Sequence, residues 1–140
     1  MAEIHRSFDL AATEEAVVRN AALLFRAKGA GLILFTPDED ALAVSASFGL
    51  SESYRSKGAL SPSRSLGETA GRTPVVVRDV ATDPRVQYRE EALREGIRSI
   101  VGLPLTGGSM LLGALRLYFA ERPDFTPGDM ASVEAFATQA

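Results

Sequence analysis

The sequence predicts an α+β domain with one antiparallel sheet, for three reasons. Two strand-like runs, 98–105 and 109–119, flank Gly107-Gly108, a pair that is typical of a hairpin turn. Apolar residues recur at helical spacing in 13–28 and 127–137, close to the two ends of the chain. The elements follow one another as helix, two strands, short helices, strand, helix, two strands and helix.

The first half of the chain supplies the first helix and a hairpin. The helix should run from Asp9 or Thr13 to about Lys28, where a glycine-containing segment ends it. Two strands, 32–35 and 41–48, follow, and a turn rich in Pro and Asp joins them.

Short elements connect this hairpin to a third strand. Residues 51–57 should form one or two helical turns. Ser65 and Glu68 match a capping box, which predicts a short helix ending at Gly71. The third strand is Val75–Val77.

Two further helices have recognisable starts. Asp83-Pro84 should open a helix, because Asp can cap it and Pro suits the first helical position. Gly96, which accepts a positive φ, should end that helix. After a loop at 122–125, the segment Thr126–Asp129 begins the last helix with an early Pro and a capping-box acid.

The central hairpin has two different faces, because successive side chains of a strand point to opposite sides. The apolar face takes Ser99, Val101, Leu103, Leu105, Leu111, Gly113, Leu115, Leu117 and Phe119. The mixed face takes Arg98, Ile100, Gly102, Pro104, Leu112, Ala114, Arg116 and Tyr118. The apolar face should lie in the core, whereas the mixed face suits solvent or a ligand.

Composition excludes several kinds of function. The chain has 140 residues, the size of one domain, with a net charge of −3 that gives no electrostatic footprint for nucleic acid. It has no Cys, so a disulfide framework, a thiolate metal site and a thiol nucleophile are excluded. The single His, His5, falls in an expected N-terminal tail at 1–8, so we expect no haem and no metal.

No segment is predicted to enter a membrane or to direct secretion. Charged residues interrupt the N-terminus before an apolar core could form. The most apolar region, 100–119, is broken by Pro104, glycines and Arg116. The absence of Cys is compatible with the reducing cytosol, and we expect a cytoplasmic protein.

The chain resembles a GAF domain over residues 9–140. The matching segments, in this order and spacing, are Gly71–Val77, Asp79–Arg85, Glu95–Ser99, Leu103–Leu105, Leu112–Leu115 and Phe125–Asp129. The resemblance implies a GAF-like, PAS-related fold with sheet order 2-1-5-4-3. The terminal helices would cover one sheet face, and helices and loops would cover a ligand pocket on the other.

The resemblance also implies a sensory or regulatory role. Such domains bind small-molecule effectors in that pocket and pass the signal through the terminal helices to an output domain. The alternative is a structural or dimerisation module whose pocket is filled by its own side chains.

The mixed face supplies candidate ligand-binding residues for a small anionic or planar molecule. They are Ile33, Phe35, Tyr88, Arg98, Ile100, Arg116 and Tyr118. Guanidinium groups offer paired donors to carboxylate or phosphate, and phenols can stack and donate. The alternative is that the arginines pair with acids at an exposed sheet rim and that the tyrosines are half-buried packing residues.

We expect no enzymatic activity. Without Cys, the sulfoxide reductase chemistry found in the family and a covalent bilin link are both excluded, and no Ser-His pair can form. The signature of cyclic-nucleotide-binding relatives is not apparent, because Asn20 and Lys28 fall in the first helix. The ligand and any cofactor stay unassigned.

The end of the chain suggests a domain cut from a larger signalling protein. Residues 136–140 contain no Gly, Pro or basic residue to end the last helix. We expect a covalently linked output domain and a homodimer through the first and last helices. The expected contacts lie near Val17, Leu24, Val133 and Ala137.

Overall fold

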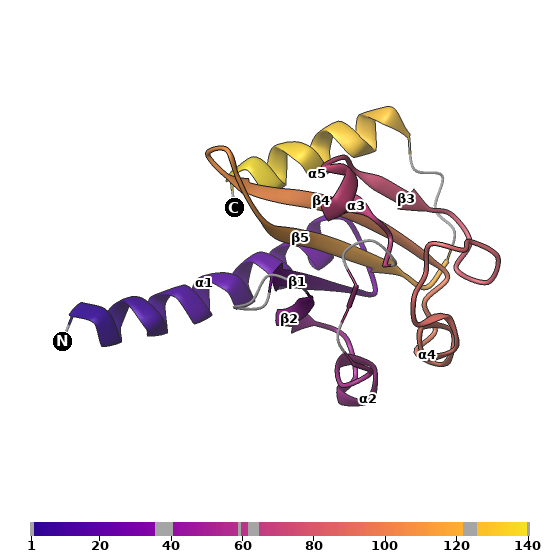
Figure 1. Cartoon of the computed structure of the whole chain (residues 1–140), viewed down its shortest axis with the longest axis horizontal. Helices are drawn as coiled ribbons and strands as arrows, with labels where there is room; N and C mark the ends of the chain where they lie inside the picture. Colours follow the sequence, from indigo (N-terminus) through magenta and orange to yellow (C-terminus); the bar gives the residue numbers. More distant parts are fainter. Residues whose placement is uncertain (1, 36–40, 59, 62–64, 122–125, 140) are drawn as a thin grey trace.

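A computed structural model shows one five-stranded antiparallel sheet with helices on both faces (Figure 1). It describes residues 2–35, 41–58, 60–61, 65–121 and 126–139, with side chains omitted for 2–11 and 138–139. The strands are β1 (Gly29–Phe35), β2 (Leu42–Phe48), β3 (Val75–Val77), β4 (Ser99–Gly107) and β5 (Met110–Phe119). Their order, β2-β1-β5-β4-β3, confirms the expected topology. The predicted turn at 36–40 and loop at 122–125 lie outside the described residues.

The central hairpin forms, but its turn is Gly108-Ser109 and not the predicted Gly107-Gly108, because Gly107 still pairs with Met110. Strands β4 and β5 pair from Ser99↔Phe119 to Gly107↔Met110, and Gly108 turns the chain with a φ of 63°. A left-handed φ of this kind favours glycine. A bulge between Leu105 and Thr106 shifts the register near the turn, so the alternation of faces changes there.

Helices α1 (Ala2–Leu24) and α5 (Pro127–Gln139) pack on the apolar face. Val18, Ala21 and Ala22 of α1 and Val133 of α5 share one buried cluster with the strand residues Val101, Leu103, Leu115, Leu117 and Phe119. This cluster confirms the assignment of the apolar face. The N-terminal half of α1 extends beyond the sheet (Figure 1).

The bounds of α1 differ from the prediction at both ends. The helix begins at Ala2, so most of the expected tail at 1–8 is helical, and no Gly or Pro interrupts the chain before Leu24. It ends before the glycines because Arg26 adopts a φ of 56° and the N–H of Ala27 donates to the carbonyl of Ala22. This is a Schellman-type end that uses a non-glycine residue.

Helix α5 begins at the predicted capping box. The backbone N–H of Asp129 donates to Thr126 Oγ1 at 3.1 Å, and the carboxylate of Asp129 accepts from the backbone N–H of Thr126 at 2.9 Å. These reciprocal hydrogen bonds satisfy two amide groups that a helix start leaves without partners.

Three short helices lie on the mixed face: α2 (Glu52–Arg55), α3 (Glu68–Gly71) and α4 (Arg89–Arg94). Ser51 caps α2, and Gly96 ends the turn after α4 with a φ of 85°, as the sequence predicted. Buried residues of this layer pack with the strand residues Ile100 and Tyr118. Among the described residues, no helix combines the length and the apolar composition needed to cross a bilayer.

Two predicted helix starts are wrong. Ser65 and Glu68 do not form a capping box: Gly67 precedes α3 without a side-chain cap, and both polar side chains turn inward. Asp83 caps a turn instead of a helix, because its carboxylate accepts from the backbone and the guanidinium of Arg85. Helix α4 therefore begins only at Arg89.

Candidate functional site

A buried ion pair lies at the centre of the mixed face. Arg116 of β5 donates through Nε to Glu68 Oε2 at 3.0 Å and through Nη2 to Glu68 Oε1 at 2.8 Å. It also donates to the hydroxyl of Ser65 at 2.9 Å and to its carbonyl at 3.0 Å. The side chains of Arg116 and Glu68 are 3% and 0% exposed, so the pair has almost no contact with solvent.

Two glycines flank this pair in the sheet. Gly31 of β1 and Gly102 of β4 are the register partners of Arg116 on its two sides. A Cβ on Gly102 would overlap Glu68 Oε2 and lie 2.9 Å from Glu68 Cδ. Glu68 can therefore reach Arg116 only because residue 102 has no side chain. A Cβ on Gly31 would make an ordinary contact, 3.5 Å from the ring of Tyr118.

The ion pair determines what Arg116 can do. Burial acts to lower the pKa of Arg116, but the carboxylate of Glu68, together with the phenols of Tyr118 and Tyr54, raises that pKa overall, so the guanidinium stays charged. The sequence offered two roles for Arg116, ligand binding and pairing with acids at an exposed rim. The structure pairs it with an acid, but in the interior. An anionic ligand would have to compete with Glu68 for this guanidinium.

An aromatic and cationic cluster adjoins the pair. The rings of Tyr54 and Tyr118 meet edge to face, with centroids 5.8 Å apart, and burial raises the pKa of both phenols. Lys57 Nζ lies 3.9 Å from the centroid of Tyr54 and 5.9 Å from that of Tyr88. Burial, with a further contribution from Arg116, lowers the pKa of Lys57 to about 8.

Glu95 fixes the segment that carries Tyr54 and Lys57. Its carboxylate accepts from the backbone N–H of Ser51 at 2.7 Å and from the Ser51 hydroxyl at 2.6 Å. Partial burial acts to raise the pKa of Glu95, but these hydrogen bonds and the nearby lysines outweigh it and lower that pKa. The start of α2 is thus tied to the end of α4 by a charged acceptor.

The predicted site residues fall into different surroundings. Ile33, Phe35 and Tyr88 share a cluster with Leu42 and Leu60, whereas Ile100 and Tyr118 belong to the cluster that contains Tyr54. Arg98 stands apart: it precedes β4, its side chain is exposed, and its backbone pairs with Phe119 and Val80.

Sequence reasoning missed four residues of this region: Tyr54, Lys57, Ser65 and Glu68. Only Glu68 could have been anticipated from the sequence. An arginine that is buried in a strand requires an acid as its partner, and glycines on the neighbouring strands leave room for one. Among the described residues, no three side chains of His, Cys, Asp or Glu gather as metal ligands would.

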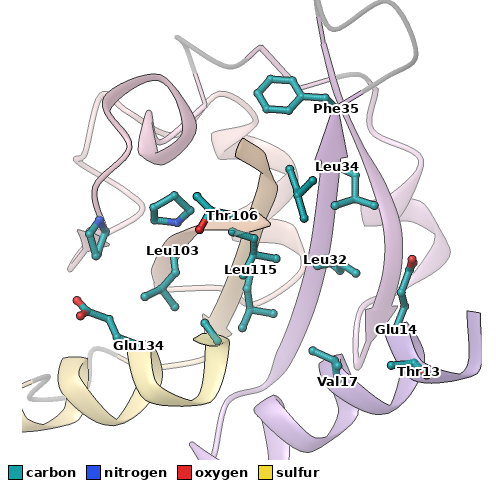
Figure 2. A pocket seen from close by; sticks show the side chains of 15 residues that line it. Thr13, Glu14, Val17, Leu32, Leu34, Phe35, Leu103, Thr106, Leu115 and Glu134 are labelled. Carbon is teal, nitrogen blue, oxygen red and sulfur yellow. The ribbon is translucent and has the colours of Figure 1, made fainter. Parts of the chain in front are cut away.

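The apolar face also carries a groove, which the sequence did not predict. It has a volume of about 780 Å³ and runs between α1 and α5 over the sheet (Figure 2). Its lining includes Val17, Leu32, Leu103, Leu112 and Ala137. Glu14 and Glu134 lie on opposite sides of it (Figure 2), and Glu14 accepts a hydrogen bond from Ser45. Leu112, assigned to the mixed face, lines this groove because the bulge changes the alternation.

The sheet order, the terminal helices on one face and the short helices on the other define a small α+β domain. The chain belongs to the GAF family: the family model described as "GAF domain" matches residues 9–140. No curated protein sequence matches the chain.

Solved structures share this fold at low sequence identity. The GAF domain region of a Geobacter sulfurreducens PCA protein superposes with a TM-score of 0.83, at 17% identity over 99% of this chain and 95% of that one. A GAF domain from a phosphoenolpyruvate-protein phosphotransferase of Coxiella burnetii gives 0.80, at 20% identity over 93% and 79%. Free methionine-R-sulfoxide reductase of Neisseria meningitidis, solved with its substrate, gives 0.75, at 19% identity over 91% and 73%. The structures that share this fold thus include an enzyme as well as GAF domains.

Proposed function

We propose that this chain is a regulatory GAF domain that binds a small-molecule effector on the mixed face and signals through α1 and α5. The supporting observation is that the mixed face buries charged and polar side chains, which lowers the stability of the fold. A buried guanidinium, a buried carboxylate, two buried phenols and a half-buried ammonium occupy positions that aliphatic residues could fill. Buried ion pairs often contribute less stability than apolar packing of similar volume, so their presence favours a functional role.

The residues of the predicted site differ in how accessible they are to a ligand. Tyr88 and Phe35 are partly exposed, whereas Tyr118, Ile33 and Ile100 are buried and would contact a ligand only if the layer that covers them moved. Arg116 becomes available to a ligand only when Glu68 moves. Arg98 contributes at most at the rim, because its side chain is exposed.

A route from this face to the terminal helices exists through the sheet. The mixed-face residues Ile33 and Arg116 belong to β1 and β5, and both strands also contact α1 on the other face. GAF domains occur linked to kinases and HD domains. We therefore infer a covalently attached output domain in a cytoplasmic signalling protein, with no catalytic role for this domain.

A ligand-free dimerisation module is the second candidate, and two observations favour it. The first is that Arg116 is already paired with Glu68. The second is that Leu23 and Leu24, at the end of α1, are each 64% exposed. Of the expected dimer contacts, Leu24 and Val17 are accessible, whereas Val133 is buried in the core of one chain. A homodimer would therefore use α1 more than the centre of α5.

Native mass spectrometry and a thermal-shift screen separate the two candidates. A retained small molecule, or a ligand that raises Tm, supports the regulatory site if the double variant Arg116→Met, Glu68→Leu loses the effect. This variant removes both charges together and so leaves no unpaired ion. Arg98→Ala is the matched control and should retain binding. A concentration-dependent dimer without any ligand effect would favour the second candidate.

A further inference from the structure

The ammonium of Lys57 lies against two aromatic rings. Its Nζ is 3.9 Å from the centroid of Tyr54, on α2, and 5.9 Å from the centroid of Tyr88, which precedes α4. The face of an aromatic ring attracts a cation within about 6 Å of its centroid. Two segments distant in sequence therefore converge on one positive charge.

The approach of Tyr88 depends on the residue next to Lys57. Gly58 has a φ of 133°, and a Cβ there would lie 2.6 Å from Tyr88 Oη. A side chain at 58 would push the phenol away from the ammonium. The close approach of Tyr88 to this segment therefore depends on the absence of a side chain at position 58.

Charges of both signs act on the position of the Lys57 ammonium. Burial and the guanidinium of Arg116 lower the pKa of Lys57, whereas the carboxylates of Glu91 and Glu95 both act to raise it, and Arg116 is itself paired with Glu68. If the Lys57 ammonium left, the guanidinium of Arg116 and the ammonium of Lys28 would face three carboxylates, those of Glu68, Glu91 and Glu95. The vacated space would attract a positive charge and repel an anion.

Lys57 itself is held weakly. The one hydrogen bond described for its Nζ goes to the carbonyl of Tyr54 at 3.3 Å, a long distance for a charged donor. Burial lowers its pKa to about 8, so the ammonium is less stable here than in water. A lysine has a flexible four-carbon stem and can swing out to solvent.

We infer that Tyr54 and Tyr88 form a binding site for a small organic ammonium ion, and that the Lys57 side chain occupies this site until such a ligand displaces it. The inference rests on the proposed regulatory function and names its ligand class. It replaces the anionic ligand that the arginines suggested. Displacement of Lys57 would release α2 from Tyr88, which connects binding to a change in the layer over the sheet.

Choline titration of the Lys57→Ala variant tests the inference. Isothermal titration calorimetry at pH 7 should show choline bound at least tenfold more tightly by Lys57→Ala than by the wild-type protein, because the competing ammonium is gone. The neutral isostere 3,3-dimethyl-1-butanol should gain no such affinity. Adding Tyr88→Leu should reverse the gain, whereas adding Tyr88→Phe, which keeps the ring, should retain it. Circular dichroism confirms that each variant is folded.

The outcomes distinguish this inference from the proposed function. Equal choline affinity in wild type and Lys57→Ala, or equal binding of the neutral isostere, overturns the ammonium site. If an anionic compound then stabilises the wild-type protein in the thermal-shift screen, the regulatory function survives with another ligand class. If no compound binds either protein, both proposals fail.

Discussion

Gly102→Ala tests whether the absence of a side chain at position 102 allows the buried ion pair to form. The new methyl group would overlap the carboxylate of Glu68 and would lie 3.1 Å from Leu66 Cδ2. Leu66 can shift by a few tenths of an ångström, but Glu68 has to leave Arg116. Removing one partner of a buried pair costs about 3–5 kcal/mol, because the other charge stays buried without compensation. We expect a loss of about 3 kcal/mol or more from the free energy of unfolding.

Equilibrium unfolding in urea measures this loss, since urea does not screen charges as guanidinium chloride does. Gly31→Ala is the matched control: Gly31 is the other register partner of Arg116, but its new Cβ would only touch the Tyr118 ring at 3.5 Å. We expect this control to change the unfolding free energy by less than about 1 kcal/mol.

A double-mutant cycle identifies the cause. In a Glu68→Ala background the clash is absent, so Gly102→Ala should cost much less than it does in the wild-type protein. A cost below 1 kcal/mol for Gly102→Ala alone would refute the steric argument. An equal cost in both backgrounds would show that Glu68 is not the group displaced.

Three further predictions concern the core, the lysine and the last helix. Leu115→Ala, at a fully buried position, should lower the unfolding free energy by about 2–5 kcal/mol in urea, and a loss below 1 kcal/mol would contradict its core placement. Between pH 7.5 and 9.5 the unfolding free energy should rise by roughly 1–2 kcal/mol. In this range Lys57 of the folded protein, with a pKa of about 8, loses its proton, whereas Lys57 of the unfolded chain, with a pKa of 10.5, keeps it. Lys57→Met should remove this rise, and above about pH 10 the trend should reverse because burial raises the pKa of Tyr54 and Tyr118. Thr126→Ala removes the hydroxyl that caps α5 and should cost about 0.5–2 kcal/mol, read from the shift in Tm; an unchanged Tm would show that the cap contributes nothing.

Local pattern was sufficient for most of the fold. Alternation placed Leu115 and Arg116 on opposite faces, and the structure confirms both. The central hairpin, with its turn one residue later than predicted, the end at Gly96 and the capping box of α5 also formed, because each depends on residues only a few positions apart. Such features can be predicted from a short segment of sequence, because no distant residue takes part in them.

Local pattern failed where distant residues compete for the same polar groups. Ser65 and Glu68 have the spacing of a capping box, but Arg116 binds both, and it lies 51 and 48 positions away along the chain. A buried guanidinium gains more from a carboxylate and a carbonyl than a four-residue helix gains from a cap. Only the tertiary structure decides between these partners.

The candidate site shows the same division. The sequence by itself determined that Ile33, Ile100 and Tyr118 face the mixed layer, because strand periodicity is local and no bulge lies close to them in the central hairpin. The tertiary structure alone decided that Glu68 neutralises Arg116 and that Lys57 lies between two tyrosines. The electrostatic character of a site depends on the distances between charges, and those distances exist only once the chain has folded.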